Sequence, residues 1–95
     1  MSATSPRPVA SVPSLDERSR EVLDFERDWW KTPGPKERRI RERLGLSPAR
    51  YQQLLNRAID LPEALEYDPM LVRRLRRLRE ERRRKRSARR LGLPL

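Results

Sequence analysis

The sequence predicts an all-α protein: a small, helix-turn-helix-like helical bundle that continues into a long, arginine-rich C-terminal helix. Apolar residues recur at the three- and four-residue spacing of amphipathic helices, and no segment alternates at period two over a useful length. Serine or aspartate followed by proline stands where two helices would begin, and glycine stands where others would end. A chain of 95 residues has room for one domain with a small core.

The chain begins with a segment that we expect to be a disordered arm. Residues 1–13 hold three prolines among serine, alanine and threonine, a composition that does not bury a core. Ser14 then has the spacing of an N-cap, because Glu17 follows three residues later as in a capping box. The helix that starts here should reach about Lys31 and end before the Thr-Pro-Gly-Pro turn.

This first helix carries a pair of tryptophans, Trp29 and Trp30, on its apolar side. Two adjacent aromatic rings can form a platform on which single-stranded bases stack. A tryptophan pair on an amphipathic helix is more often part of the core. We therefore predict that the pair packs in the core.

Residues 36–59 have the pattern of a helix-turn-helix. Gly45 stands where a left-handed C-cap would end a first short helix, and Ser47 with Pro48 supplies the N-cap and first residue of a second helix. In DNA-binding motifs of this kind the second helix enters the major groove. Glutamine and asparagine can pair with adenine and arginine with guanine, so the expected base contacts are Arg50, Gln52, Gln53, Asn56 and Arg57.

Arg41 departs from the usual pattern of that motif. It follows Ile40, at the position where the two helices usually approach closest and where a small residue is normal. Its stem would have to snorkel outward, which would widen the crossing of the helices. The alternative interpretation is a plain three-helix bundle whose polar residues are there only because they are exposed.

After the helix-turn-helix we expect a single helical turn and then a long helix. Asp60 is predicted to open the turn, which should end at Leu65. Asp68 and Pro69 repeat the signal of an N-cap and first helical residue, and the helix that they open should reach Arg90.

The apolar spacing divides this long helix into two parts. Leu71, Leu75 and Leu78 recur at i, i+4 and i+7, so the first part is predicted to dock on the core. From Arg79 onward the stripe ends, and the helix should project into solvent. The predicted organisation is therefore an arm at 1–13, a bundle at 14–78, and a basic extension with its tail at 79–95.

The long helix also holds all of the net charge. Residues 73–90 carry twelve basic side chains against Glu80 and Glu81, which accounts for the net charge of +10, and the remainder of the chain balances to zero. A local basic stripe on a helix is typical of proteins that bind nucleic acid or another polyanion. The expected phosphate contacts are Arg38, Arg39, Arg76, Arg79, Arg82, Arg83, Arg84, Lys85, Arg86, Arg89 and Arg90.

Several classes of protein do not fit this composition. The chain has no cysteine and no histidine, and it shows no nucleophile–base pair, phosphate loop or metal-ligand cluster. We therefore expect no enzyme, no cofactor, no metal site and no small-molecule substrate. No apolar run approaches the roughly 18 residues that span a bilayer, and the N-terminus lacks the pattern of a signal peptide. A cytoplasmic protein without membrane contacts is the expectation.

Three stretches carry a resemblance to a known family. They read LDFERDWW at 23–30, RYQQLLN at 50–56, and PEAL at 62–65 followed by DPMLVRRL at 68–75. Together they resemble a family of small basic actinobacterial proteins catalogued as a domain of unknown function, over about residues 15–92. The resemblance implies an actinobacterial, cytoplasmic protein and supplies no activity. Residues 36–58 separately resemble the helix-turn-helix of sigma factor region 4, through the sequence LGLSP.

Taken together, these observations predict a DNA-binding protein, either a transcriptional regulator or a nucleoid-associated factor. The second helix of the helix-turn-helix would contact the groove of duplex DNA, and the arginine-rich helix would bind phosphates. Two alternatives remain. The chain could be an interaction module for RNA polymerase or a sigma factor, or it could bind RNA or the ribosome, because arginine-rich helices also fit RNA.

Overall fold

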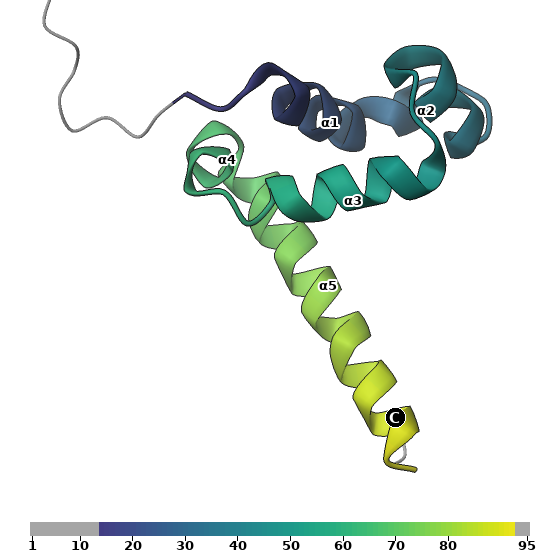
Figure 1. Cartoon of the computed structure of the whole chain (residues 1–95), viewed down its shortest axis with the longest axis vertical. Helices are drawn as coiled ribbons and strands as arrows, with labels where there is room; N and C mark the ends of the chain where they lie inside the picture. The colour runs from purple at the N-terminus through teal and green to yellow at the C-terminus, as the bar shows by residue number, and fades with distance from the viewer. Residues whose placement is uncertain (1–13, 93–95) are drawn as a thin grey trace, which may run out of the picture.

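The computed structural model describes residues 14–92, which form five α-helices and one short 3-10 helix (Figure 1). No strand occurs in this range, which confirms the predicted all-α class. The expected disordered arm at 1–13 and the last three residues of the tail lie outside the described residues. The elements in chain order are α1 (Glu17–Asp28), η1 (Trp29–Lys31), α2 (Lys36–Leu44), α3 (Pro48–Ala58), α4 (Pro62–Tyr67) and α5 (Pro69–Arg90).

The helices form a small body from which α5 projects. Figure 1 shows α1 and α2 together on one side of α3, while α5 leaves on the other side, from the C-terminal end of α3. The described molecule is elongated, with principal extents of 68 × 32 × 21 Å. Because 22 helical residues span about 33 Å, α5 accounts for much of the long dimension.

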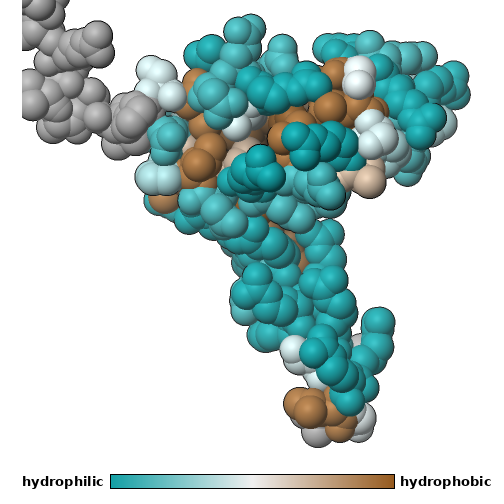
Figure 2. Space-filling view, in the orientation of Figure 1, coloured by the Kyte–Doolittle hydropathy of each residue, from teal (hydrophilic) through white to brown (hydrophobic). Residues whose placement is uncertain are grey.

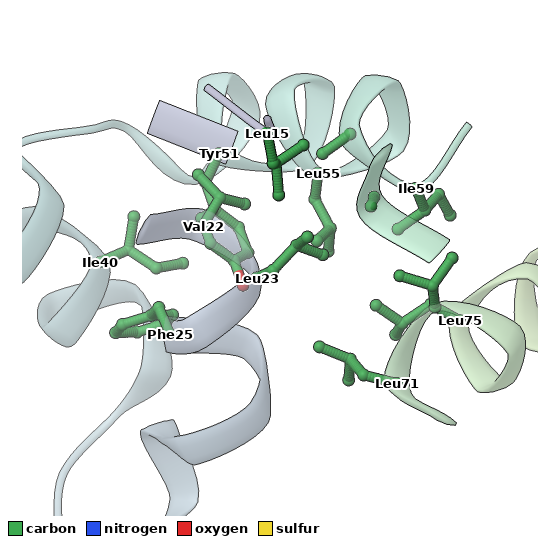
Figure 3. Packing of buried hydrophobic residues seen from close by; sticks show 13 residues of the cluster. Leu15, Val22, Leu23, Phe25, Ile40, Tyr51, Leu55, Ile59, Leu71 and Leu75 are labelled. Carbon is green, nitrogen blue, oxygen red and sulfur yellow. The ribbon is translucent and has the colours of Figure 1, made fainter. Parts of the chain in front are cut away.

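One apolar core joins all five α-helices. Figure 3 shows Val22 and Leu23 of α1 close to Tyr51 of α3, with Leu71 and Leu75 of α5 on the far side of the cluster. Tyr51, Leu23, Ile59, Val22 and Val72 are the largest fully buried side chains. The ring of Phe25 meets that of Tyr51 edge to face, with 5.5 Å between centroids. The core therefore holds α3 by its inner face and leaves the opposite face uncovered.

Most helix ends lie where the sequence predicts them. Gly45 ends α2 in the left-handed conformation, at φ 67°. The Ser47 hydroxyl accepts from the Arg50 amide at 3.1 Å, and the Asp68 carboxylate accepts from the Leu71 amide at 3.3 Å. These caps fix the starts of α3 and α5.

Two predicted N-caps are wrong. The α1 cap is Asp16, whose carboxylate accepts from the Ser19 amide at 3.0 Å, and not Ser14. This hydrogen bond lowers the pKa of Asp16. The predicted turn after α3 is the six-residue helix α4, and its N-cap is Leu61, without a side-chain hydrogen bond. Asp60 instead pairs with Arg79, which the local sequence could not show.

Two apolar predictions also need correction. Trp29 packs against the core as expected, but Trp30 is 65% exposed. The chain turns into a 3-10 helix at this point, and the Trp30 indole donates to the Arg27 carbonyl at 2.8 Å across the end of α1. In α5, Leu71, Val72 and Leu75 are buried, whereas Leu78 is 41% exposed. The apolar anchor of α5 therefore ends one turn earlier than the leucine spacing predicts.

Candidate nucleic-acid interface

The outer face of α3 carries the residues expected to contact bases. Arg50, Gln52, Gln53 and Arg57 are exposed, and Asn56 is half-buried. Their side chains pair along the helix: Arg50 donates to the Gln53 side-chain oxygen at 3.2 Å, and Gln52 donates to the Asn56 side-chain oxygen at 3.3 Å. Such surface pairs are weak and exchange readily with other partners. The structure thus brings all five residues onto one helix, four of them open to solvent.

Three arginines of α2 differ in how accessible they are. Arg38 and Arg41 are exposed, so the Arg41 stem does run outward as its position requires. Arg39 is more enclosed, and its guanidinium lies 3.8 Å from the Glu42 carboxylate. Of the two phosphate contacts predicted on α2, Arg38 is therefore the more accessible.

The second half of α5 is the most basic surface of the described chain. Figure 2 shows mostly hydrophilic side chains along the projecting part of α5, with a hydrophobic group at its tip. Arg83 is 3.3 Å from the carboxylate of Glu80, one turn before it, and both groups are well exposed. The other candidates here are also exposed: Arg82, Arg84, Lys85, Arg86, Arg89 and Arg90.

Arg76 and Arg79, also predicted to contact phosphate, lie instead against the end of α3. The Arg76 Nε donates to the Ile59 carbonyl at 2.6 Å. Arg79 donates to the Asn56 carbonyl at 3.3 Å and to both carboxylate oxygens of Asp60, at 3.1 and 2.6 Å. Positive groups at a helix C-terminus compensate its free carbonyls and its dipole. The Arg79 guanidinium also lowers the pKa of the Asp60 carboxyl.

A polar cluster that the sequence did not reveal fixes the start of α3. The Tyr51 hydroxyl donates a hydrogen bond to Glu26 of α1, and the Lys36 ammonium lies 2.8 Å from the same carboxylate. Lys36 also lies over the rings of Trp29 and Tyr51, at 5.2 and 5.5 Å. Burial, and then the neighbouring Glu26, raises the pKa of Tyr51. The cluster joins α1, α2 and α3, so it sets how α3 is presented.

A second cluster, centred on Arg27, ties α1 to the start of α5. Its guanidinium lies 3.3 Å from Asp24, 3.0 Å from Asp28 and 3.1 Å from Asp68, the N-cap of α5. The Tyr67 hydroxyl also donates to Asp24, at 2.8 Å. The contacts of Arg27 with Asp68 and of Tyr67 with Asp24 span more than forty positions of sequence, and no local pattern marks them. The arrangement ties the start of α5 to α1.

Residues 14–92 hold neither a metal-ligand cluster nor a membrane-spanning helix. Acidic side chains do not gather there in the groups of three that would serve as metal ligands. Of the helices in the same range, none combines the length and apolar composition that crossing a bilayer requires.

A small all-α body with a basic helical extension defines the fold class of this protein. The family model described as a protein of unknown function (DUF3263) matches residues 14–87, and the chain belongs to that family. The match covers the whole of α1 to α4 and α5 as far as Ser87. No curated protein matches the chain, and no solved structure matches it.

Proposed function

We propose that this protein binds duplex DNA, as a transcriptional regulator or nucleoid-associated factor, and that it acts at the nucleoid. The observation that carries the proposal is the second half of α5, where seven basic side chains project beyond the body against only Glu80 and Glu81. A folded protein gains no packing from such a segment, and like charges along a helix repel each other. The closely spaced phosphates of a duplex compensate that repulsion.

The outer face of α3 supports the second half of the proposal. This helix is held rigidly from behind by the core and by the Glu26–Lys36–Tyr51 cluster, while its polar side faces solvent. A rigid helix with exposed amides and guanidinium groups is what reading of base edges in the major groove requires. Phosphate contacts from α5 would supply affinity, and α3 would supply any preference among sequences.

The phosphate-binding role can be tested with two full-length variants that lose equal charge from the same helix. In the first, Arg82→Gln, Arg86→Gln and Arg89→Gln change the projecting half. In the matched control, Arg73→Gln, Arg74→Gln and Arg77→Gln change exposed arginines of the docked half. If the projecting half binds phosphates, the slope of log K against log salt falls by up to about 2.7 in the first variant, at 0.9 per lost contact, and less in the control. Equal losses would mean that diffuse charge, and not this segment, provides the affinity.

The role of α3 is tested separately from that of α5. Gln52→Ala, Gln53→Ala and Asn56→Ala together should flatten the preference among DNA sequences in a selection experiment, while non-specific binding and the salt slope are kept. Alanine favours helix, so α3 should remain folded, which circular dichroism checks. The same fractional loss on every sequence would contradict base reading by α3.

A further inference from the structure

Two arginines of α5 contact the end of α3, just before α5 projects from the body. Arg76 and Arg79 lie one helical turn apart on α5, and both donate to the last carbonyls of α3, at Ile59 and Asn56. Asp60, in the turn that follows α3, accepts from Arg79 through both of its oxygens. A guanidinium held by two parallel hydrogen bonds is restricted in orientation as well as in position. We call these three side chains (Arg76, Arg79 and Asp60) the bracket.

From the geometry we infer that the bracket holds α5 at a fixed angle to α3 so that both helices contact one DNA duplex, which would lie in the angle between them. This inference rests on the proposed function and deepens it. It makes Arg76 and Arg79 positioning residues, and it leaves the phosphate contacts of α5 to the residues beyond them.

The placement of the two helices supports a shared duplex. The ribbon has α1 and α2 on one side of α3, and α5 departs on the other side (Figure 1). The core holds the buried face of α3, while Gln52 and Gln53 are exposed. Beyond Arg79 the helix continues for eleven residues, or about 17 Å. The major groove is only about 8.5 Å deep. With α3 in the groove, the end of α5 therefore extends past the groove and alongside the sugar-phosphate backbone.

The distribution of charge around α5 shows why its angle matters more than its rotation. Residues 82–86 are five consecutive basic side chains, all exposed. At 100° per residue they cover the full circumference of the helix. Some of them would face the phosphates at any rotation about the helix axis. The tilt of that axis, which the bracket sets, decides whether they reach the same duplex as α3.

Asp60→Asn provides a test, because its effect on charge and its effect on positioning predict opposite changes in DNA affinity. The substitution removes a negative charge, so on electrostatics alone it should strengthen DNA binding. If Asp60 holds the bracket, the substitution instead loosens α5, and ordering the helix again on DNA should weaken binding roughly three- to tenfold. Glu63→Gln, in α4, removes one negative charge outside the bracket and is the matched control. It should leave the affinity unchanged or raise it.

The angle itself can be measured without DNA. The chain has no cysteine, so Glu37→Cys on α2 and Ser87→Cys on α5 give two unique positions for spin labels. We expect a narrow distribution of distances between the labels, and a broader one when Asp60→Asn or Arg79→Gln is added. Arg83→Gln, which removes one charge from α5 beyond the bracket, should leave the distribution narrow. An unchanged distribution in Asp60→Asn would overturn the bracket.

Binding of a single duplex is tested with two short duplexes that carry different fluorophores. Energy transfer between the duplexes on adding the protein would show bridging and would overturn the shared duplex. Tighter or unchanged DNA binding by Asp60→Asn would also overturn the shared duplex. If the wild-type protein binds no duplex, the proposed function fails and the shared duplex with it, while the spin-label distances still decide whether the bracket exists.

Discussion

The two halves of α5 belong to one helix and are both rich in arginine, yet the structure uses them differently. Residues 69–79 contain five arginines, and two of these are bound to the end of α3 while apolar neighbours fill the core. Residues 80–90 contain seven basic side chains, all exposed. The difference lies in Arg76 and Arg79, which face carbonyl groups and Asp60, whereas every basic side chain of the second half faces solvent. Composition alone does not separate a structural arginine from an available one.

The largest expected effect comes from the apolar anchor of the first half. Leu75 is 8% exposed within the core, so Leu75→Ala should lower the free energy of unfolding by about 2–4 kcal/mol. Leu78→Ala, one turn later, removes the same atoms from a side chain that is 41% exposed and should cost less than about 1 kcal/mol. Urea unfolding followed by circular dichroism measures both. Similar losses at the two positions would contradict a boundary between them.

Substitution of Asp68, at the start of the first half, should have a smaller effect on the free energy of unfolding. Its two contributions, the helix cap and the ion pair, can be separated. Asp68 caps α5 through the Leu71 amide and also pairs with Arg27 of α1. Asp68→Ala removes both interactions and should cost about 1–2 kcal/mol in urea unfolding. Asp68→Asn keeps a good cap but loses the ion pair, so it should retain most of the stability. If asparagine is as damaging as alanine, the link to Arg27 and not the cap anchors α5.

Local signals were sufficient for most of the fold. Gly45, Ser47 and Asp68 act within three or four residues of their own position, so their sequence pattern predicts the ends that the structure shows. The apolar spacing likewise predicted buried residues at Leu71 and Leu75. It failed at Leu78 because burial there depends on where α3 ends, and spacing along α5 contains no information on that.

The candidate site could be predicted less completely from the sequence than the fold. The basic segment and the outer face of α3 could be named from residue types, but the polar contacts that orient them join distant positions. Glu26 meets Tyr51 25 residues away, and Asp60 meets Arg79 19 residues away. Asp60 had a plausible local interpretation as an N-cap. Only the packing of the helices decides which partner such a side chain finds.

The smallest expected effect is on the pH dependence of the free energy of unfolding. It comes from the ion pair between Asp60 and Arg79, the last residue of the first half of α5. The Arg79 guanidinium lowers the pKa of Asp60 in the folded state below the unfolded value of about 3.9. The stability from this pair is therefore fully present above that value and is lost as the pH falls through the lower folded pKa. Because the Asp60 side chain is 60% exposed, the contribution should stay within about 1 kcal/mol. Urea unfolding of wild type and Asp60→Asn at several pH values should show a difference near neutrality that disappears in acid. A difference in stability between wild type and Asp60→Asn that persists below the folded pKa would mean that asparagine disturbs the turn itself. Backbone geometry, and not this ion pair, would then separate the two halves of α5.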